Sequence, residues 1–380
     1  MRIAVFIPYY VPGFRGGGPI RTMEAMVAAH GHRHEFRILT PDTDWGQREP
    51  LPVPTQRWVP CAGALVWYVR AASATSLARG LLAVRSWRPD VVYLNGVMPV
   101  KWSILPLVLA ITGLFGAVRV VVAPRGEFGA GALALKAVRK RWFLAASRLL
   151  RCYDRVTWHA STELEAAEIR AVFPAARVVV RENEVLLPGR ADPPAPAPDE
   201  DTRRLRVVFL SRVSPKKGLH LLIEALRLVD PGLRVRLDVY GDGDAAYVTR
   251  CRSAAARLPS RITTVFHGDV HPDRVSAAFR QGDVFAFPTA HENFGHAIAE
   301  ALAASCPVLL ADVTPWTLAL RDGGGRIVPS LEPADWATEL CEWARADPSE
   351  RFRRRLAAGR AYDAWHARRP TSSVFDLAFG

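Results

Sequence analysis

The sequence has little to support a disulfide framework or a cysteine-based metal site. Its 380 residues include five cysteines, which are widely spaced and form no C-x-x-C pair. This spacing disfavours a structural zinc site and is typical of a protein kept in a reducing compartment. The first residues are apolar only as far as Pro8, which is too short for the apolar core of a signal peptide. We therefore expect a cytoplasmic protein.

No apolar run is long and uninterrupted enough to predict a membrane span. The most apolar stretch, residues 102–118, contains Pro106, Gly113 and Gly116, and a strand pattern follows it at once. A spanning helix needs about 20 consecutive apolar residues. We expect this stretch to form a buried helix of a βα unit, because buried helices beside a parallel sheet are also strongly apolar.

Acidic residues are scarce in the first half of the chain, and the net charge is +13. Residues 1–190 hold 25 of the 50 Lys and Arg but 13 of the 37 Asp and Glu, and no acid occurs between Glu127 and Asp154. Segment 131–151 mixes basic with apolar residues, so it can lie on an anionic membrane or face an anionic acceptor. The alternative is an ordinary solvated Arg-rich helix. No recognition motif for nucleic acid accompanies the charge, and we expect no nucleic-acid partner.

Short β-branched runs alternate with longer helical patterns, which predicts parallel sheets built from βα units. A Pro-rich stretch interrupts this alternation and predicts a stiff linker at 188–203. We expect a first domain at 1–187, to which residues 362–380 return, and a second domain at 204–361. The expected strands are 3–8, 36–40, 66–69, 91–95, 118–123, 156–159 and 178–181 in the first half, and 207–210, 284–288 and 308–311 in the second, with Thr314–Trp316 at the edge of the second sheet.

Residues 284–304 have the pattern of a strand, a loop and the start of a helix, and they contain two carboxylates. Helical spacing begins after Gly295, and a helix N-terminus opened by glycine can bind a phosphate. Glu292 and Glu300 are separated by about 12 Å of helical rise, so they could contact opposite ends of an extended ligand. A sugar nucleotide has this form. The plain alternative is a carboxylate favoured by the helix dipole together with a solvated one.

The same stretch resembles the signature of the glycosyl transferases group 1 family. The resemblance rests on Glu292-Asn-Phe-Gly-His296, on Ala299-Glu-Ala-Leu-Ala303 and on Cys306-Pro-Val-Leu309. It implies an α/β protein of the GT-B fold, with two Rossmann-like parallel-sheet domains facing across a cleft. It also implies a retaining enzyme that moves a hexose-type sugar from a nucleoside diphosphate to a hydroxyl. The acceptor would be a glycan, a lipid-linked glycan or a small molecule.

The resemblance implies roles for particular residues in binding the nucleotide-sugar donor. Arg212 and Lys217 match a pair of family cations, which would stabilise the charge that develops on the departing diphosphate. Glu292 would hold sugar hydroxyls and Glu300 the ribose hydroxyls. The predicted catalytic residues are therefore Arg212, Lys217 and Glu292. The other predicted contacts of the nucleotide sugar are Gly17, Gly18, Gly241, His267, Asn293, Phe294, Gly295, His296 and Glu300.

A metal ion is not expected, although Asp242-Gly-Asp244 resembles the D-x-D metal site of the other large transferase fold. D-G-D after a strand is a common turn, and the family has a glycine turn at this place. Two cations and a helix N-terminus would already neutralise the diphosphate. We therefore expect neither a metal nor a cofactor.

Polar residues at the ends of first-half strands are candidates for binding the acceptor. Asn95 ends one expected strand, and Arg125 and Glu127 follow the next, where ligands of parallel sheets gather. His159 is a third such position. The alternatives are a Glu127 that pairs with Arg125 and a His159 that is a satisfied strand-end histidine. Family members usually carry a histidine in one of the first two loops, which is missing here, whereas Pro124-Arg-Gly126 is similar to surface-polysaccharide transferases.

Other functions remain compatible with these residues. A glycosyltransferase of natural-product biosynthesis would differ only in its acceptor. A glycoside hydrolase would use Glu292 and Glu300 as acid and base. A non-catalytic protein that binds glycans or membranes would keep the fold without binding nucleotides. The sequence does not identify the nucleotide base, the sugar or the acceptor. It is compatible with a cytoplasmic location and with a peripheral one on the inner membrane face.

Overall fold

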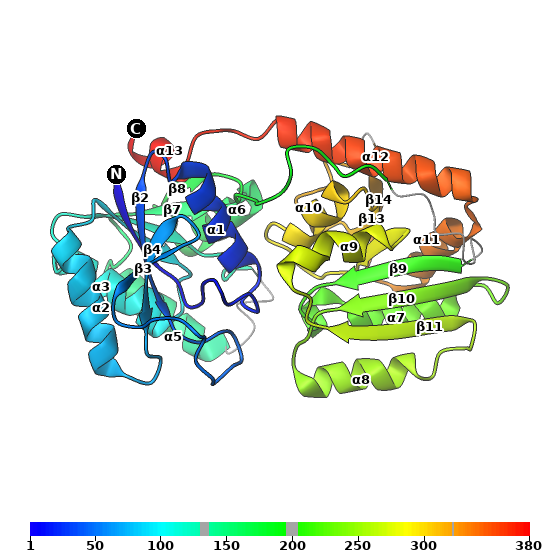
Figure 1. Cartoon of the computed structure of the whole chain (residues 1–380), viewed down its shortest axis with the longest axis horizontal. Coiled ribbons are helices and arrows are strands. Elements are labelled where there is room, and N and C mark those ends of the chain that lie inside the picture. The colour runs from blue at the N-terminus through cyan, green and yellow to red at the C-terminus, as the bar shows by residue number, and fades with distance from the viewer. Residues whose placement is uncertain (130–136, 195–203, 321–322) are drawn as a thin grey trace. The chain divides into compact units, whose positions relative to one another are not determined.

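The chain forms two compact units. Unit 1 comprises Met1–Leu186 and Thr371–Gly380, and unit 2 comprises Leu187–Pro370. The computed structural model (Figure 1) describes residues 1–129, 137–194, 204–320 and 323–380. Most of the expected linker and the first part of the expected basic segment, residues 195–203 and 131–136, lie outside the described residues.

The chain returns to unit 1 at Thr371, later than the residue 362 expected from the sequence. The reason is helix α12 (Pro348–Ala367), which continues through residue 362 as part of unit 2. The returning segment ends in α13 (Val374–Phe379), whose Phe375 is fully buried in unit 1 and packs edge-on against Tyr93. Arg181 also donates to the Ser372 carbonyl at 2.8 Å. These contacts fix the last ten residues on the first sheet.

Unit 1 is built on an eight-stranded sheet of order β3-β4-β2-β1-β5-β6-β7-β8. Every neighbouring pair is parallel except β3 with β4, which are antiparallel. All seven expected strands are present, and β3 is the one that the sequence did not indicate. The strands are β1 (Arg2–Phe6), β2 (Glu35–Pro41), β3 (Trp58–Cys61), β4 (Ala64–Val69), β5 (Val91–Asn95), β6 (Arg119–Ala123), β7 (Val156–Ala160) and β8 (Arg177–Val180).

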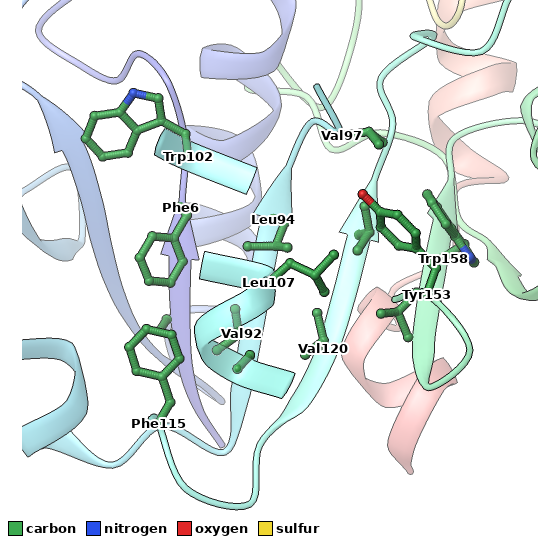
Figure 2. Close-up of a cluster of buried hydrophobic side chains, with 14 of the residues drawn as sticks. Phe6, Val92, Leu94, Val97, Trp102, Leu107, Phe115, Val120, Tyr153 and Trp158 are labelled. Atoms are coloured by element: carbon green, nitrogen blue, oxygen red, sulfur yellow. The ribbon is translucent and has the colours of Figure 1, made fainter. Parts of the chain in front are cut away.

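Alternate residues of these strands face two hydrophobic cores, as the period of two in a strand requires. One core (Figure 2) combines Phe6, Leu94 and Trp158 with buried residues of α2, α3, α5 and α6. The other core combines Ile3, Val5 and residues of α1 and α13. The helices are α1 (Gly18–His30), α2 (Ala74–Trp87), a π-helix at Val100–Ile104, α3 (Leu105–Ile111), α5 (Ala137–Leu149) and α6 (Glu163–Val172).

The strongly apolar stretch 102–118 forms helix only in part. The π-helix and α3 occupy its first ten residues, and a turn follows in which Gly113 and Gly116 have positive φ. Trp102, Leu107 and Phe115 are buried in the first core, whereas Val108 and Ile111 are exposed. Within the described residues, no helix is both long and apolar enough to cross a membrane.

Unit 2 contains a six-stranded, fully parallel sheet of order β11-β10-β9-β12-β13-β14. The expected edge at Thr314–Trp316 is wrong, because β14 pairs with β13 and ends the sheet. Pro315 lacks the amide that a strand must donate, and Trp316 instead turns inward to contact Phe294. The strands are β9 (Arg204–Leu210), β10 (Arg234–Tyr240), β11 (Ile262–Gly268), β12 (Val284–Phe287), β13 (Val308–Ala311) and β14 (Gly325–Val328).

Helix α12 is fixed to unit 2 by two buried arginines. Arg351 contacts the Asp283 carboxylate at 3.3 Å, and Arg355 donates to the Arg280 carbonyl at 2.9 Å. Arg206 bonds the other oxygen of Asp283 at 2.7 Å, so that the buried carboxylate is compensated by two cations. The remaining helices of unit 2 are 3-10 turns at Pro215–Lys217 and Pro272–Arg274 and the α-helices α7 (Leu219–Leu228), α8 (Ala245–Ala255), α9 (Val275–Arg280), α10 (His296–Ala303) and α11 (Pro333–Arg345).

Candidate functional site

Two loops lie against each other at the carboxyl edge of the unit 2 sheet. One loop follows β9 and includes Lys216, and the other follows β12 and includes Thr289 and Ala290. The Ala290 amide donates to the Lys216 carbonyl at 2.8 Å, and the Thr289 hydroxyl donates to it at 3.3 Å. Gly218 has φ +75°, and a Cβ there would lie 1.9 Å from the Pro288 carbonyl oxygen. Only glycine permits this approach, which fixes the two loops side by side.

This packing pairs Lys217 with Glu292. The Lys217 ammonium donates to Oε2 of Glu292 and lies 5.1 Å from the ring centre of Phe287. Oε1 of Glu292 accepts the Asn293 amide at 3.1 Å. The two charged side chains are 19% and 14% exposed, so both are shielded from water but remain accessible. The sequence placed them in one site without indicating that they bond directly.

Helix α10 begins beside this ion pair. Its N-cap is Gly295, at φ +85°, and no side chain in the described part of the chain caps it. A helix N-terminus of this kind can bind an anion through its first amides. The preceding residue, Phe294, is buried, and its carbonyl accepts the indole N–H of Trp316 at 2.6 Å. Trp316 thus positions the glycine that opens the helix, a contact that the sequence analysis missed.

The other predicted donor-binding residues of unit 2 lie on the same segments. Asn293 and His296 are partly exposed on either side of Gly295, and Glu300 is buried on α10. Arg212 is exposed in the loop after β9. Gly241 follows β10 and packs against the loop after β9. A Cβ at Gly241 would lie 2.0 Å from the Ser211 carbonyl oxygen.

His267 lies at the end of β11, one strand beyond β10. Its ring stacks on Tyr240 with centroids 4.3 Å apart, and Nε2 lies 2.7 Å from Asp238. Burial raises the pKa of Asp238, but the hydrogen bonds from Arg236 and His267 outweigh it and lower that pKa. This flat pair of rings offers a stacking surface at the sheet edge. Among the described residues, His, Cys, Asp and Glu form no group of three placed to hold a metal ion.

The predicted acceptor-side residues Asn95, Arg125 and His159 belong to one hydrogen-bonded network at the carboxyl edge of the unit 1 sheet. Arg125, at φ +55°, donates through Nε to Asn95 at 2.7 Å and through a terminal nitrogen to the Tyr93 hydroxyl at 2.8 Å. Its other terminal nitrogen donates to Asn183. The partners all offer neutral oxygens, so the guanidinium joins three segments of the sheet edge.

His159 is buried inside this network, so it is the satisfied strand-end histidine of the alternative reading and not a candidate that faces the acceptor. Its Nε2 donates to the Arg181 carbonyl at 2.8 Å, which leaves Nδ1 to accept the Tyr93 hydroxyl at 2.8 Å. Burial, with a contribution from the nearby Arg125 charge, lowers the pKa of His159 to about 3. A neutral histidine with both nitrogens bonded supports the sheet edge and has no lone pair to offer a substrate.

Glu127 braces the loop after β5. Its Oε2 accepts the amides of Val97 and Met98, each at 2.9 Å, and in the described structure it forms no bond with Arg125, contrary to the alternative considered from the sequence. Burial raises the pKa of Glu127, and the two amide bonds oppose this rise. The carboxylate therefore fixes the position of residues that follow Asn95.

The glycine loop of unit 1 leads into α1, with Gly17 as its N-cap and Gly18 as its first residue. The loop is fastened by Asp44, whose Oδ2 accepts the amides of Phe14 at 2.9 Å and Arg15 at 3.0 Å. Asp44 was missed by the sequence analysis. The available signal was an acid just beyond the end of β2, where polar side chains of a parallel sheet meet neighbouring loops.

Comparison with known proteins finds a matching protein family for each half of the chain. Residues 195–358 match the family described as "Glycosyl transferases group 1", and residues 16–184 match the "Glycosyl transferase 4-like domain". The chain belongs to the group 1 glycosyltransferases. This group 1 chain is 34% identical over 141 residues to the D-inositol 3-phosphate glycosyltransferase of Nocardia farcinica, a match that covers 35% of this chain and 31% of that protein. The chain spans about a third of the length of the curated relatives it matches.

Solved structures of other glycosyltransferases share the fold of this group 1 chain. HepE of Anabaena, in complex with UDP and glucose, superimposes with a TM-score of 0.69 at 17% identity, covering 97% of this chain and 95% of HepE. WaaG, a glycosyltransferase involved in lipopolysaccharide biosynthesis, gives 0.64 at 17% identity, with 99% and 98% covered. These likenesses confirm the expected α/β GT-B fold with two Rossmann-like units.

Proposed function

We propose that this protein is a retaining glycosyltransferase whose donor is a nucleoside-diphosphate sugar. The observation that carries the proposal is the ion pair of Lys217 and Glu292 at the uncapped N-terminus of α10. A diphosphate brought to these amides would take the place of the carboxylate on Lys217, because phosphate is the stronger partner for a cation at this position. Glu292 would then be released to accept hydrogen bonds from sugar hydroxyls. Arg212, in the same loop, would supply the second cation.

The reaction would need no basic side chain. As the anomeric C–O bond breaks, its electron pair passes to the leaving phosphate oxygen, where Lys217, Arg212 and the α10 amides stabilise the growing charge. The acceptor hydroxyl oxygen forms the new bond on the same face of the sugar, and its proton passes to the leaving diphosphate. Because these groups already neutralise the diphosphate, we propose that no metal is required.

The donor and the acceptor are proposed by class. The complex of HepE with UDP and glucose supports a hexose carried by a nucleotide. The role of WaaG in lipopolysaccharide biosynthesis supports a glycan or lipid-linked glycan as the acceptor. The inositol phosphate named for the Nocardia relative favours a small molecule as the second candidate. A glycoside hydrolase is disfavoured, because Glu292 is bonded to Lys217 and Glu300 is buried rather than facing it across an open site.

Thermal unfolding of the purified protein with UDP, GDP, ADP or TDP, and with their sugars, tests the donor site. A ligand that binds only the folded state raises the melting temperature, so we expect a rise with one base. Arg212→Ala should abolish the rise. Arg227→Ala, which removes an exposed arginine of α7 outside the proposed site, should keep it. If no nucleotide shifts the melting temperature, or if Arg212→Ala keeps the full shift, the proposed donor site is wrong.

A further inference from the structure

Helix α5 of unit 1 (Figure 1) exposes large apolar side chains to solvent. Trp142 is 75% exposed, Val138 68% and Leu149 83%, and Leu150 continues the exposed series just past the helix end. An amphipathic helix on a parallel sheet normally turns polar side chains outward. Single exposed apolar residues are common on protein surfaces, but a cluster that includes a tryptophan calls for a partner.

These residues form one stripe along α5. At 3.6 residues per turn, Val138, Trp142, Ala145 and Leu149 fall within about 60° of the helix circumference. The opposite side of the helix carries the buried Leu144, which packs in the first core of unit 1, and the buried Ser147. The helix therefore has two apolar faces, one that the unit 1 core covers and one that it leaves exposed.

Basic residues border the exposed stripe. Arg141 and Arg148 are both exposed and lie on one side of it, and Arg151 follows the helix. The Arg148 guanidinium lies 5.8 Å from the ring centre of Phe173, and Arg151 pairs at the surface with Asp154. No acid occurs in the sequence between Glu127 and Asp154, so the charge along the whole helix is positive.

We propose that this stripe is a docking surface for an anionic lipid bilayer. Leu149, Trp142 and Val138 would insert at the boundary between headgroups and acyl chains, and Arg141 and Arg148 would contact lipid phosphates. Tryptophan suits this boundary because its ring is apolar and its N–H can remain hydrated. The geometry gives unit 1 a peripheral attachment to membrane without a spanning segment.

The charge disfavours the other possible occupants. A symmetric dimer through this face would bring the arginines of one copy against those of the other. The phosphates of a nucleic acid could pair with the arginines, but they would make no contact with the three exposed apolar side chains of the stripe. An anionic bilayer satisfies both the charges and the apolar stripe.

Co-sedimentation with vesicles tests the proposal on the full chain. We expect binding to vesicles of phosphatidylcholine with about one-third phosphatidylglycerol, weaker binding at high salt and little binding to pure phosphatidylcholine. The variant Arg141→Ala/Trp142→Ala should partition at least about tenfold more weakly, since it removes one contacting cation and the largest inserted side chain.

The matched control is Arg227→Ala/Leu228→Ala on α7 of unit 2, which also removes an exposed arginine and an adjacent exposed apolar residue, Leu228 being 57% exposed. It should bind vesicles as the parent does. Melting temperatures verify that both variants fold. The proposal is overturned if the parent ignores anionic vesicles or if both variants bind equally. It is also overturned if sedimentation velocity shows that the α5 variant dissociates a dimer, because the occupant would then be a second copy.

Discussion

The carboxyl edges of the two sheets are built differently. In unit 2 the edge carries opposite charges, Lys217 and Glu292, that bond to each other beside an uncapped helix. In unit 1 the edge carries Arg125 and the neutral His159, which are bonded to neutral protein groups. An ion pair can exchange one partner for a ligand ion, whereas a neutral network that satisfies itself mainly fixes shape. This difference supports the proposal that unit 2 stabilises charge and that the unit 1 edge provides a rigid frame.

The largest effect that this comparison predicts is a loss of stability on replacing one glycine at each edge, Gly218 in unit 2 and Gly17 in unit 1. Gly218→Ala places a Cβ 1.9 Å from a backbone oxygen at φ +75°. We expect unit 2 to lose roughly 3 kcal/mol or more of unfolding free energy, because both the strained φ and the overlap must be relieved. Gly17→Ala in unit 1 also has positive φ, but nothing lies within 4 Å of its Cβ. Its cost should be about 1–3 kcal/mol, because Gly17 combines φ +71° with ψ −137°, a conformation that residues other than glycine rarely adopt.

Urea unfolding of both variants measures this difference. If Gly17→Ala and Gly218→Ala cost the same, then the contact between the loops after β9 and β12 does not determine the geometry of the unit 2 edge. The binding of the nucleotide identified by thermal unfolding should also fall for Gly218→Ala, because Lys217 is the adjacent residue.

The second prediction concerns catalysis. Lys217→Ala should lower kcat by about 10²–10³-fold, the loss typical of removing one preorganised group that stabilises transition-state charge. Lys101→Ala removes an exposed lysine of unit 1 that donates to the Ala71 carbonyl, and it should leave kcat unchanged. Release of nucleoside diphosphate from the identified donor provides the assay.

A double variant shows whether the ion pair acts as a unit. Because Lys217 and Glu292 bond directly, Lys217→Ala/Glu292→Ala should lose less activity than the two single losses multiplied together. Fully multiplicative losses would mean that the two side chains act independently, contrary to the exchange of partners proposed for donor binding.

The two edges also differ in how far the sequence predicted them. Gly295 and the helical spacing after it are neighbours in the chain, so a local pattern indicated the helix terminus and placed Glu292 beside it. The bond from Arg125 to Asn183 joins residues 58 positions apart, and Glu127 reaches a loop 30 positions earlier. Strand order and loop backbone determine such partners. The sequence therefore indicated that these residues gather at one edge, but not which groups bond His159 or that Glu127 accepts two amides.

The third prediction is a pH dependence of unit 1. The pKa of His159 is lowered to about 3 in the folded state, from 6.5. Between these values the unfolded chain binds the proton and the folded chain does not, so stability is full above the unfolded pKa and falls as the pH decreases. The expected loss is about 1.4 kcal/mol per pH unit, or roughly 2 kcal/mol from pH 6.5 to about 5.

His159→Gln provides the comparison for this pH dependence, since its amide can donate to Arg181 and accept from Tyr93 without titrating. Urea unfolding of unit 1 should then depend less steeply on pH than in the parent. In unit 2, Asp238 has a pKa lowered below its usual value of 3.8. Its contribution to the free energy of unfolding is therefore lost only at a more acidic pH than the one at which His159 acts. Equal slopes in parent and variant would show that His159 is protonated in the folded protein.

The smallest effect concerns Trp316, which positions the donor loop without belonging to the proposed donor contacts. Trp316→Phe keeps an aromatic ring against Phe294 but removes the N–H bond to its carbonyl, worth about 1 kcal/mol. We expect a several-fold fall in kcat/KM for the donor, because the α10 amides that would bind the diphosphate move while Lys217 stays in place. The control is Trp343→Phe on α11, whose buried N–H has no acceptor among the described residues. A merely structural role for Trp316 would lower the melting temperature of Trp316→Phe and leave its kcat/KM for the donor unchanged.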